Sequence, residues 1–249
     1  MSDTDAGQTQ TAAVVVDSAT TQSDATVAAP AFGADANTLA ATDAAPAGET
    51  RLLASTVSVA AAAPSIYHLY VSTAGLDTNT GTLAKPFRTI TRAAKAAKPS
   101  TTIHVAAGTY RENVSTTLHG TATARIRYVS DTKWGAKVIG SGTEGMWTNK
   151  GNYTDITGFD ISGPGRLGIL NYASNTLVSN NHIHNLTISG GCTGSGGAGV
   201  VNANYSGSNG DIIGNVVHDI GVPGKCNGVQ GIYSSNYGGK IYNNIVYRA

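Results

Sequence analysis

One pattern is written three times in this chain: Asn175-Thr-Leu-Val-Ser-Asn-Asn-His-Ile-His-Asn185, Asn209-Gly-Asp-Ile-Ile-Gly-Asn-Val-Val-His-Asp219 and Gly239-Lys-Ile-Tyr-Asn-Asn-Ile-Val-Tyr-Arg248. In each copy, an aliphatic residue is followed three places later by asparagine, and two places after that by a second aliphatic residue. A weaker copy precedes them, with Phe159 in the asparagine position. A repeat of roughly 20 to 50 residues, without helical periodicity, indicates a solenoid in which each unit buries its apolar face against the next.

The composition of each unit predicts strands rather than helices. Short runs of β-branched residues are separated by Gly, Asn and Ser, which favours three strands per turn of a coil. Equivalent strands of successive turns pair in parallel at about 4.8 Å. We therefore expect Val178, Ile212 and Ile241 to form one inward column. The repeated asparagines are expected at a bend, in left-handed backbone, with their amides bonded to one another.

This arrangement resembles the right-handed parallel β-helix of the pectate lyase superfamily, in which an inward asparagine ladder occupies the tight turn between the second and third sheets. The resemblance extends from about Ile66 to the end of the chain. It implies an all-β fold, a single-stranded right-handed parallel β-helix with a short N-terminal capping helix.

The chain is expected to have two parts. Residues 1–64 are rich in Ala, Thr and Asp, and they have too little apolar surface to offset the entropy of ordering, which predicts a disordered leader or linker. Residues 65–249 form the β-helix domain, with an N-terminal cap over 65–114 and repeating rungs over 115–249. The last repeat stops in the middle of its pattern, so we expect a chain truncated at the C-terminus.

A capping helix is expected over residues 85–98, with Pro86 at its first position. The apolar face of that helix comprises Phe87, Ile90, Ala94 and Ala97. The helix start Pro-Phe-Arg-Thr-Ile and the later Gly-Thr-Tyr turn are similar to the N-terminal cap of polysaccharide lyase families nine and six. A lid of this kind protects the open strand edge of a solenoid against edge-to-edge association.

The charge of the chain argues against some classes of partner. Its net charge is +1, its pI is near 7.8, and its Lys and Arg residues are scattered, which excludes a strongly basic nucleic-acid-binding surface. No stretch approaches the roughly 20 apolar residues of a membrane span, and no signal peptide is recognisable. The resemblance implies an extracellular or cell-surface protein with an acidic polysaccharide as partner. A monomer is expected.

The two cysteines are separated by the repeat offset. Cys192 and Cys226 are 34 residues apart, as are Asn181 and Asn215, so they occupy equivalent places in stacked loops. Neighbouring rungs are close enough for a disulfide, which is the favoured interpretation. A free thiol pair or a metal site is the alternative, although no further ligands share the spacing.

The resemblance also places a substrate along the first sheet and implies β-elimination at a uronic acid. That reaction needs a base, a cation that stabilises the enediolate-like intermediate, and a proton donor. Lys225 is the candidate base, Arg166 the carboxylate clamp and Tyr233 the donor. The two cations are alternatively ordinary solvated loop residues. Substrate-binding positions are expected at Asn171, Asn202 and Gln230, and the families resembled here commonly hold calcium on the substrate carboxylate.

Histidines repeat as well. His184 and His218 stand at the same offset of 34, next to His182. They are either a base or a metal pair, or residues that simply fill an outer strand, and the identity of any metal stays open. Two functions are therefore compatible with the sequence: a polysaccharide lyase-like enzyme, or a non-catalytic glycan-binding or cell-surface module.

Overall fold

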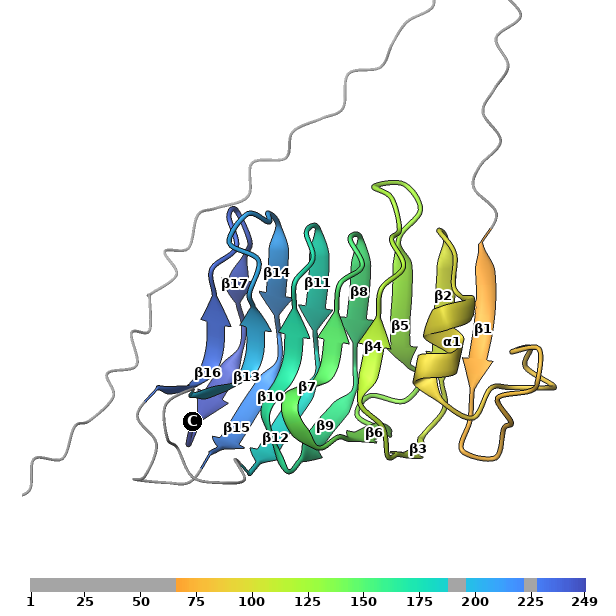
Figure 1. The fold of residues 1–249 in the computed structure, drawn as a ribbon, viewed down its shortest axis with the longest axis horizontal. Coiled ribbons are helices and arrows are strands. Elements are labelled where there is room, and N and C mark those ends of the chain that lie inside the picture. Colours follow the sequence, from red (N-terminus) through yellow and green to blue (C-terminus); the bar gives the residue numbers. More distant parts are fainter. Residues whose placement is uncertain (1–65, 188–195, 222–227) are drawn as a thin grey trace, which may run out of the picture. The chain divides into compact units, whose positions relative to one another are not determined.

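The computed structural model describes residues 66–187, 196–221 and 228–249. Its strands form three parallel sheets, and the chain visits one sheet after another before it starts the next rung (Figure 1). This is a single-stranded right-handed parallel β-helix, which confirms the predicted fold class. The division at residue 64 lies outside the described residues.

Each sheet is named by its place in the rung. The first sheet contains β4 (Val114–Thr116), β7 (Gly142–Asn149), β10 (Gly165–Asn171), β13 (Gly197–Asn202) and β16 (Val229–Ser234). The second sheet contains β1 (Tyr67–Val71), β2 (Thr101–Val105), β5 (Ile126–Ser130), β8 (Thr154–Thr157), β11 (Thr176–Ser179), β14 (Gly210–Ile213) and β17 (Ile241–Tyr242). The third sheet contains β3 (Gly108–Tyr110), β6 (Ala136–Ile139), β9 (Asp160–Gly163), β12 (His182–Leu186), β15 (Val216–Ile220) and β18 (Ile245–Tyr247).

Columns of apolar side chains fill the inside of the coil. Val178 pairs with Ile212, and Ile212 pairs with Ile241, so the predicted column is confirmed. Each sheet supplies one such column of buried residues: Trp147, Ile169 and Val200; Ile156, Val178 and Ile212; Ile161, Ile183 and Val217. Burial of one such aliphatic side chain contributes about 1.5–3 kcal/mol, so stacking of rungs is the main source of stability.

The asparagine ladder lies at the turn between the second and third sheets, as predicted. Asn215 Oδ1 accepts hydrogen bonds from the Asn181 backbone N–H at 3.0 Å and from Asn181 Nδ2 at 3.1 Å. Asn244 Oδ1 accepts the equivalent pair from Asn215 at 2.9 and 3.0 Å. The Phe159 N–H donates to Asn181 Oδ1 at 2.9 Å, so the weaker copy joins the same ladder.

The left-handed backbone at this turn belongs to the residue before each ladder asparagine, which corrects one expectation. These preceding residues have φ between 55° and 81°: Gly158, Asn180, Gly214 and Asn243. One left-handed residue turns the chain sharply from the second sheet to the third. The asparagine that follows can then direct its side chain inward.

The capping helix is shorter than the sequence predicts. Helix α1 spans Ile90–Ala96, and its N-cap is Thr89, whose side chain accepts from Arg92 N. Pro86 lies outside the helix, because Phe87 is held as an edge partner of β1: the Phe87 N–H donates to Tyr70 O at 2.9 Å. The pairing of Phe87 with β1 takes the place of the first helical turn that Pro86 could otherwise begin.

The predicted apolar face of the helical region is nevertheless confirmed, and α1 covers the N-terminal end of the coil. Phe87, Ile90, Ala94 and Ala97 are all buried. Helix α1 packs against β1, β2 and β4 (Figure 1). Among the described residues, no helix has the length and apolar character that crossing a membrane requires.

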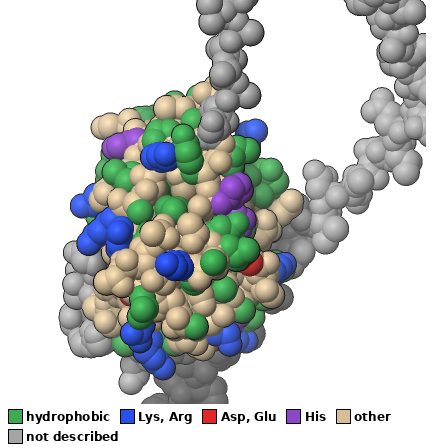
Figure 2. All heavy atoms as spheres, turned by 90° about the vertical axis from the view of Figure 1, so that its right-hand side faces the viewer, with side chains coloured by type: hydrophobic (Ala, Val, Ile, Leu, Met, Phe, Trp, Pro, Cys, Tyr) green, Lys and Arg blue, Asp and Glu red, His purple; other side chains and the backbone are tan. Residues whose placement is uncertain are grey.

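Basic side chains are dispersed over the capped end. Figure 2 views this end, and its Lys and Arg side chains lie at separate places rather than in one patch.

Candidate functional site

The outer face of the first sheet is where the sequence analysis expects a substrate, and it carries Tyr233, the candidate proton donor. Strand alternation turns Ile169 and Val200 into the core and directs Leu170 and Val201 to the opposite face. A second apolar cluster, separate from the core, lies on that face. It comprises Leu167, Leu170, Ala198, Val201, Ala203 and Tyr233.

Tyr233 contributes its ring to this cluster and its hydroxyl to a neighbouring tyrosine. Its hydroxyl oxygen lies 3.0 Å from the hydroxyl oxygen of Tyr205. That hydrogen bond raises the pKa of Tyr233 above its ordinary value of 10.0. At neutral pH the phenol is therefore protonated, which suits a proton donor and not a base.

Arg166 and Gln230 lie at the opposite end of the sheet from the Tyr205 hydroxyl. Arg166 is the second residue of β10 and is partly buried, and its Nε donates to Gly196 O at 2.8 Å. Gln230 is exposed on β16, two strands away in the order β10, β13, β16. Tyr233 follows Gln230 by three residues, roughly 10 Å along the strand. Tyr233 pairs with Val201 and Val201 with Leu170, four residues beyond Arg166, so the three residues share one sheet at different positions along its strands.

Asn171 and Asn202 are buried, which corrects their expected role in substrate binding. Both have 0% exposure. Asn149 Nδ2 donates to Asn171 Oδ1 at 2.8 Å, and Asn171 Nδ2 donates to Asn202 Oδ1 at 2.9 Å. They form a second internal ladder at the turn after the first sheet. Their amides are occupied within the protein and have no surface for a substrate to contact.

Three other predicted residues lie outside the described residues: Lys225, Cys192 and Cys226. Neither the proposed base nor the expected disulfide is tested by the structure.

A row of exposed tyrosines follows the strands of the first sheet, and sequence reasoning missed it. Tyr172 follows β10, Tyr205 follows β13 and Tyr237 follows β16, with exposed fractions of 42%, 67% and 73%. Lys150 follows β7, and its Nζ lies 5.9 Å from the centroid of the Tyr172 ring. We call these four residues together with Tyr233 the tyrosine edge. The available signal was a tyrosine within three residues after each of three successive strands.

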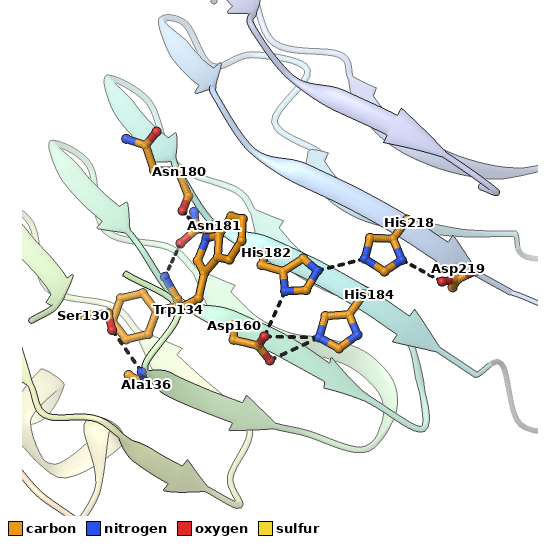
Figure 3. A network of polar contacts seen from close by, with 11 residues as sticks. Ser130, Trp134, Ala136, Asp160, Asn180, Asn181, His182, His184, His218 and Asp219 are labelled. Atoms are coloured by element: carbon orange, nitrogen blue, oxygen red, sulfur yellow. Dashed lines mark hydrogen bonds and ion pairs between the residues drawn. The ribbon is translucent and has the colours of Figure 1, made fainter. Parts of the chain in front are cut away.

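A histidine cluster lies on the outer face of the third sheet (Figure 3). His182 and His184 are two residues apart on β12 and therefore face the same side. His218 on β15 pairs with His184, and Asp160 on β9 pairs with His182. The sequence offset of 34 indicated the histidine column correctly, and the structure adds His182 to it.

Carboxylates hold the imidazoles of this cluster. Asp160 Oδ2 lies 2.9 Å from His182 Nδ1, and both Asp160 oxygens lie 3.2 Å from His184 Nε2. Asp219 Oδ2 lies 2.6 Å from His218 Nδ1. Hydrogen bonds from Arg248 and His218 hold the pKa of Asp219 below its usual range, so this carboxylate is ionised.

Aromatic rings flank the cluster on two sides. The Trp134 ring lies 4.8 Å from the His182 ring, and the Tyr247 ring stacks on His218 at 4.6 Å with an interplanar angle of 11°. Trp134 is itself fixed, because its Nε1 donates to Asn180 O at 2.8 Å. Burial, with a further contribution from the neighbouring histidines, lowers the pKa of His182. Neutral imidazole is therefore favoured at this position.

Calcium, which the resemblance implied, can be compared with the ligands that these side chains offer. Among the described residues, the one group of three or more His, Cys, Asp or Glu side chains that could hold a metal is His182, His184 and His218. Calcium prefers six to eight oxygen ligands. This group offers nitrogen ligands, so calcium stays a prediction that the group does not test.

Comparisons with known proteins agree with the fold. Three parallel sheets with an asparagine ladder at the second turn make this a right-handed parallel β-helix. A family model described as "Protein of unknown function (DUF1565)" matches residues 73–119, the capped end of the coil. Over 54 residues the chain is 44% identical to the uncharacterized protein YwoF of Bacillus subtilis (strain 168), an alignment that covers 22% of this chain and 12% of YwoF.

Among solved structures, the chain is similar in fold to two lyases and a lacto-N-biosidase. An alginate lyase from Paenibacillus sp. str. FPU-7 has a TM-score of 0.42 at 19% identity, over 63% of each chain. A rhamnogalacturonan lyase has a TM-score of 0.47 at 15% identity, over 73% of this chain and 68% of the other. A lacto-N-biosidase from Eubacterium ramulus has a TM-score of 0.45 at 13% identity, over 73% of this chain and 34% of the other. Similarity at this level concerns the fold and carries no argument about activity.

Proposed function

We propose that this β-helix is a carbohydrate-active protein, located outside the cell or at its surface, that binds an acidic polysaccharide along the tyrosine edge. The observation that carries the proposal is the repetition of an exposed tyrosine after three successive strands of one sheet: Tyr172, Tyr205 and Tyr237.

The three tyrosines belong to successive rungs but differ in their place within the rung, since Tyr172 follows Asn171, the partner of Asn202, whereas Tyr237 pairs with Ser208. An extended polymer that crosses several rungs can contact all three rings. Tyrosine combines an apolar ring with a polar hydroxyl, which suits the apolar faces and hydroxyl edges of a sugar. Lys150 lies beside Tyr172, and its charge favours an acidic over a neutral glycan.

The finer proposal is β-elimination at a uronic acid, with Lys225 as base, Arg166 as carboxylate clamp and Tyr233 as proton donor. Tyr233 offers a phenol hydroxyl on the outer face of the first sheet, which is the kind of group that a proton donor requires. The distance between Arg166 and Tyr233 along the sheet favours the alternative, a non-catalytic glycan-binding module. A calcium ion on the substrate carboxylate is part of the lyase proposal and not of the binding-module alternative.

Binding is tested with the full chain on immobilised polygalacturonate, alginate and glycosaminoglycans, with a neutral glycan as reference. We expect retention on at least one acidic glycan, and its loss in the triple variant Tyr172→Ala, Tyr205→Ala, Tyr237→Ala. Tyr242→Ala is the matched control, because Tyr242 is 48% exposed but lies on the second sheet. Equal retention of the triple variant and the wild type would overturn the proposed site.

Elimination is tested separately, through the absorbance of unsaturated sugar ends, with added calcium and with chelator. Product that disappears in Lys225→Ala and in Tyr233→Phe, but persists in Lys240→Ala, supports the lyase. Lys240 is an exposed lysine at the second-sheet side of the same rung. Retention on a glycan without product supports the binding module instead.

A further inference from the structure

We propose that His182, His184 and His218 bind a divalent transition-metal ion of the zinc class on the outer face of the third sheet. This site is independent of the tyrosine edge, which belongs to the first sheet. The proposal rests on how the three imidazoles are oriented, how far apart their nitrogens lie, and which ligand chemistry they offer.

Each of the three rings has one nitrogen against a carboxylate and a second nitrogen available. Asp160 occupies His182 Nδ1 and His184 Nε2, and Asp219 occupies His218 Nδ1. Metal-ligating histidines characteristically place their second ring nitrogen against a carboxylate, which fixes the tautomer and the ring orientation. The nitrogens that remain are His182 Nε2, His184 Nδ1 and His218 Nε2.

The three histidines lie close enough to share one ion. Each of the three residues offers a nitrogen within 4.8 Å of the others, and His182 Nε2 lies 2.8 Å from His218 Nε2. Two nitrogens on a tetrahedral zinc ion, each at 2.0–2.1 Å, are about 3.3 Å apart. A ring displacement of roughly half an ångström would therefore bring this pair to ligand spacing.

The surroundings of the cluster favour a bound ion over free, hydrated side chains. The three histidine side chains have exposed fractions of 21%, 18% and 13%, so the site is partly buried yet open to an incoming ion. The flanking Trp134 and Tyr247 rings restrict how far His182 and His218 can rotate away.

The ligand chemistry selects the class of ion. Imidazole nitrogen suits zinc, copper, nickel and cobalt, whereas calcium and magnesium require oxygen ligands. Three imidazoles leave one position of a four-coordinate ion for a ligand other than these side chains. The ion would also cross-link adjacent rungs, because His182 and His184 lie on β12 and His218 lies on β15.

The molecule contains an internal control with the same parts but one ligand fewer. His68 Nδ1 lies 3.0 Å from His104 Nε2, and His104 Nδ1 lies 2.9 Å from Asp131 Oδ1, on the second sheet. This pair has a carboxylate partner and no third histidine in the described chain. If histidine pairs bound metal non-specifically, both histidine groups would bind an ion. If binding needs three histidines, only the cluster on the third sheet would bind one.

The experiment titrates the full chain, freed of metal by chelator, with Zn²⁺ by calorimetry and with Co²⁺ by visible absorption. We expect one ion per chain and a Co²⁺ spectrum of low coordination number. The variant His182→Gln, His218→Gln should lose binding at this site. Asp160→Asn should retain it with about 10–100-fold weaker affinity, as expected for loss of a carboxylate that orients ligands.

Two controls make the outcome decisive. The variant His68→Gln, His104→Gln should bind as the wild type does, and so should Cys192→Ser, Cys226→Ser, which removes thiols as ligands. Circular dichroism confirms that each variant is folded. Wild-type protein that binds neither ion, or a His182→Gln, His218→Gln variant that binds both as tightly as the wild type, would overturn the proposal.

Discussion

His182 Nε2 and His218 Nε2 lie 2.8 Å apart across two adjacent strands of the third sheet. Both rings face a carboxylate through their other nitrogen, Asp160 for His182 and Asp219 for His218. If both Nδ1 atoms donate to those carboxylates, the two Nε2 lone pairs point at each other. Such a contact is favourable only when a proton or a metal ion lies between the nitrogens.

The first prediction follows from that contact. A saturating concentration of Zn²⁺, about 100 times the dissociation constant, should stabilise the folded chain by about 2.7 kcal/mol. For a domain of this size the midpoint of thermal unfolding should rise by roughly 5–11 °C. Calorimetry with Zn²⁺ and then with excess chelator measures the shift. The same shift in His182→Gln, His218→Gln would contradict the prediction.

The asparagine ladder predicts a graded loss of stability. Asn215 is fully buried, and its Oδ1 accepts two hydrogen bonds from Asn181. Asn215→Ala leaves those donors without a partner, at a cost of about 1–3 kcal/mol for each buried group. Urea unfolding should therefore show a loss of about 2–6 kcal/mol for the two groups together. Asn244→Ala should reduce the free energy of unfolding by less, because Asn244 in the next rung is only half-buried. Equal losses in the two variants would contradict this prediction.

Acid should selectively remove the contribution of Asp77 to stability. Burial acts to raise the pKa of Asp77, but hydrogen bonds from Thr89 and Arg88 and the charge of Arg92 outweigh it, so the pKa is lowered. A lowered pKa gives stability that is present above the unfolded value near 3.9 and lost as the pH falls through the folded value.

The test of this contribution is Asp77→Asn. At pH 7 the variant should be less stable by about 1 kcal/mol, because a neutral amide oxygen accepts weaker hydrogen bonds from Arg88 and Thr89 than a carboxylate does. The difference between the variant and the wild type should shrink below about pH 4 and vanish in stronger acid. Denaturant curves at several pH values measure it, and a difference that is constant with pH would argue against an ionised Asp77.

The tyrosine edge predicts weaker binding without weaker folding. Each single change, Tyr172→Ala, Tyr205→Ala or Tyr237→Ala, should reduce glycan affinity about 3–10-fold, on the order of 1 kcal/mol for one ring contact. The free energy of unfolding should change by about 0.5 kcal/mol or less, because these rings are exposed. Affinity electrophoresis and urea unfolding measure the two quantities. A loss of folding stability equal to the loss of binding would mean that the rings are structural.

Stacking of the rungs could be predicted from the sequence because its causes are local and repeated. The column of Val178, Ile212 and Ile241 and the ladder of Asn181, Asn215 and Asn244 follow from side-chain alternation and from one repeated turn. A single repeat already specifies which residue faces inward and which residue stands at the turn.

The direction of two side chains in the first sheet was predicted wrongly. Asn171 and Asn202 were expected to face a substrate, whereas both are buried in a ladder that begins at Asn149. Each asparagine stands two residues after a core residue, Ile169 or Val200, so strand alternation turns it inward together with that residue. The inward amides are stable there because they bond to the asparagines of adjacent rungs, a contact that forms only when the rungs stack.

The sequence by itself determined the coil, its inward columns and the histidine offset, because each follows from a short pattern repeated along the chain. Only the tertiary structure decided that Phe87 pairs with β1 and delays the helix to Ile90, and that Asp160 joins the histidines of later rungs. The physical reason is that these contacts join segments with unrelated local patterns, and they form only when stacking of the rungs has placed those segments side by side.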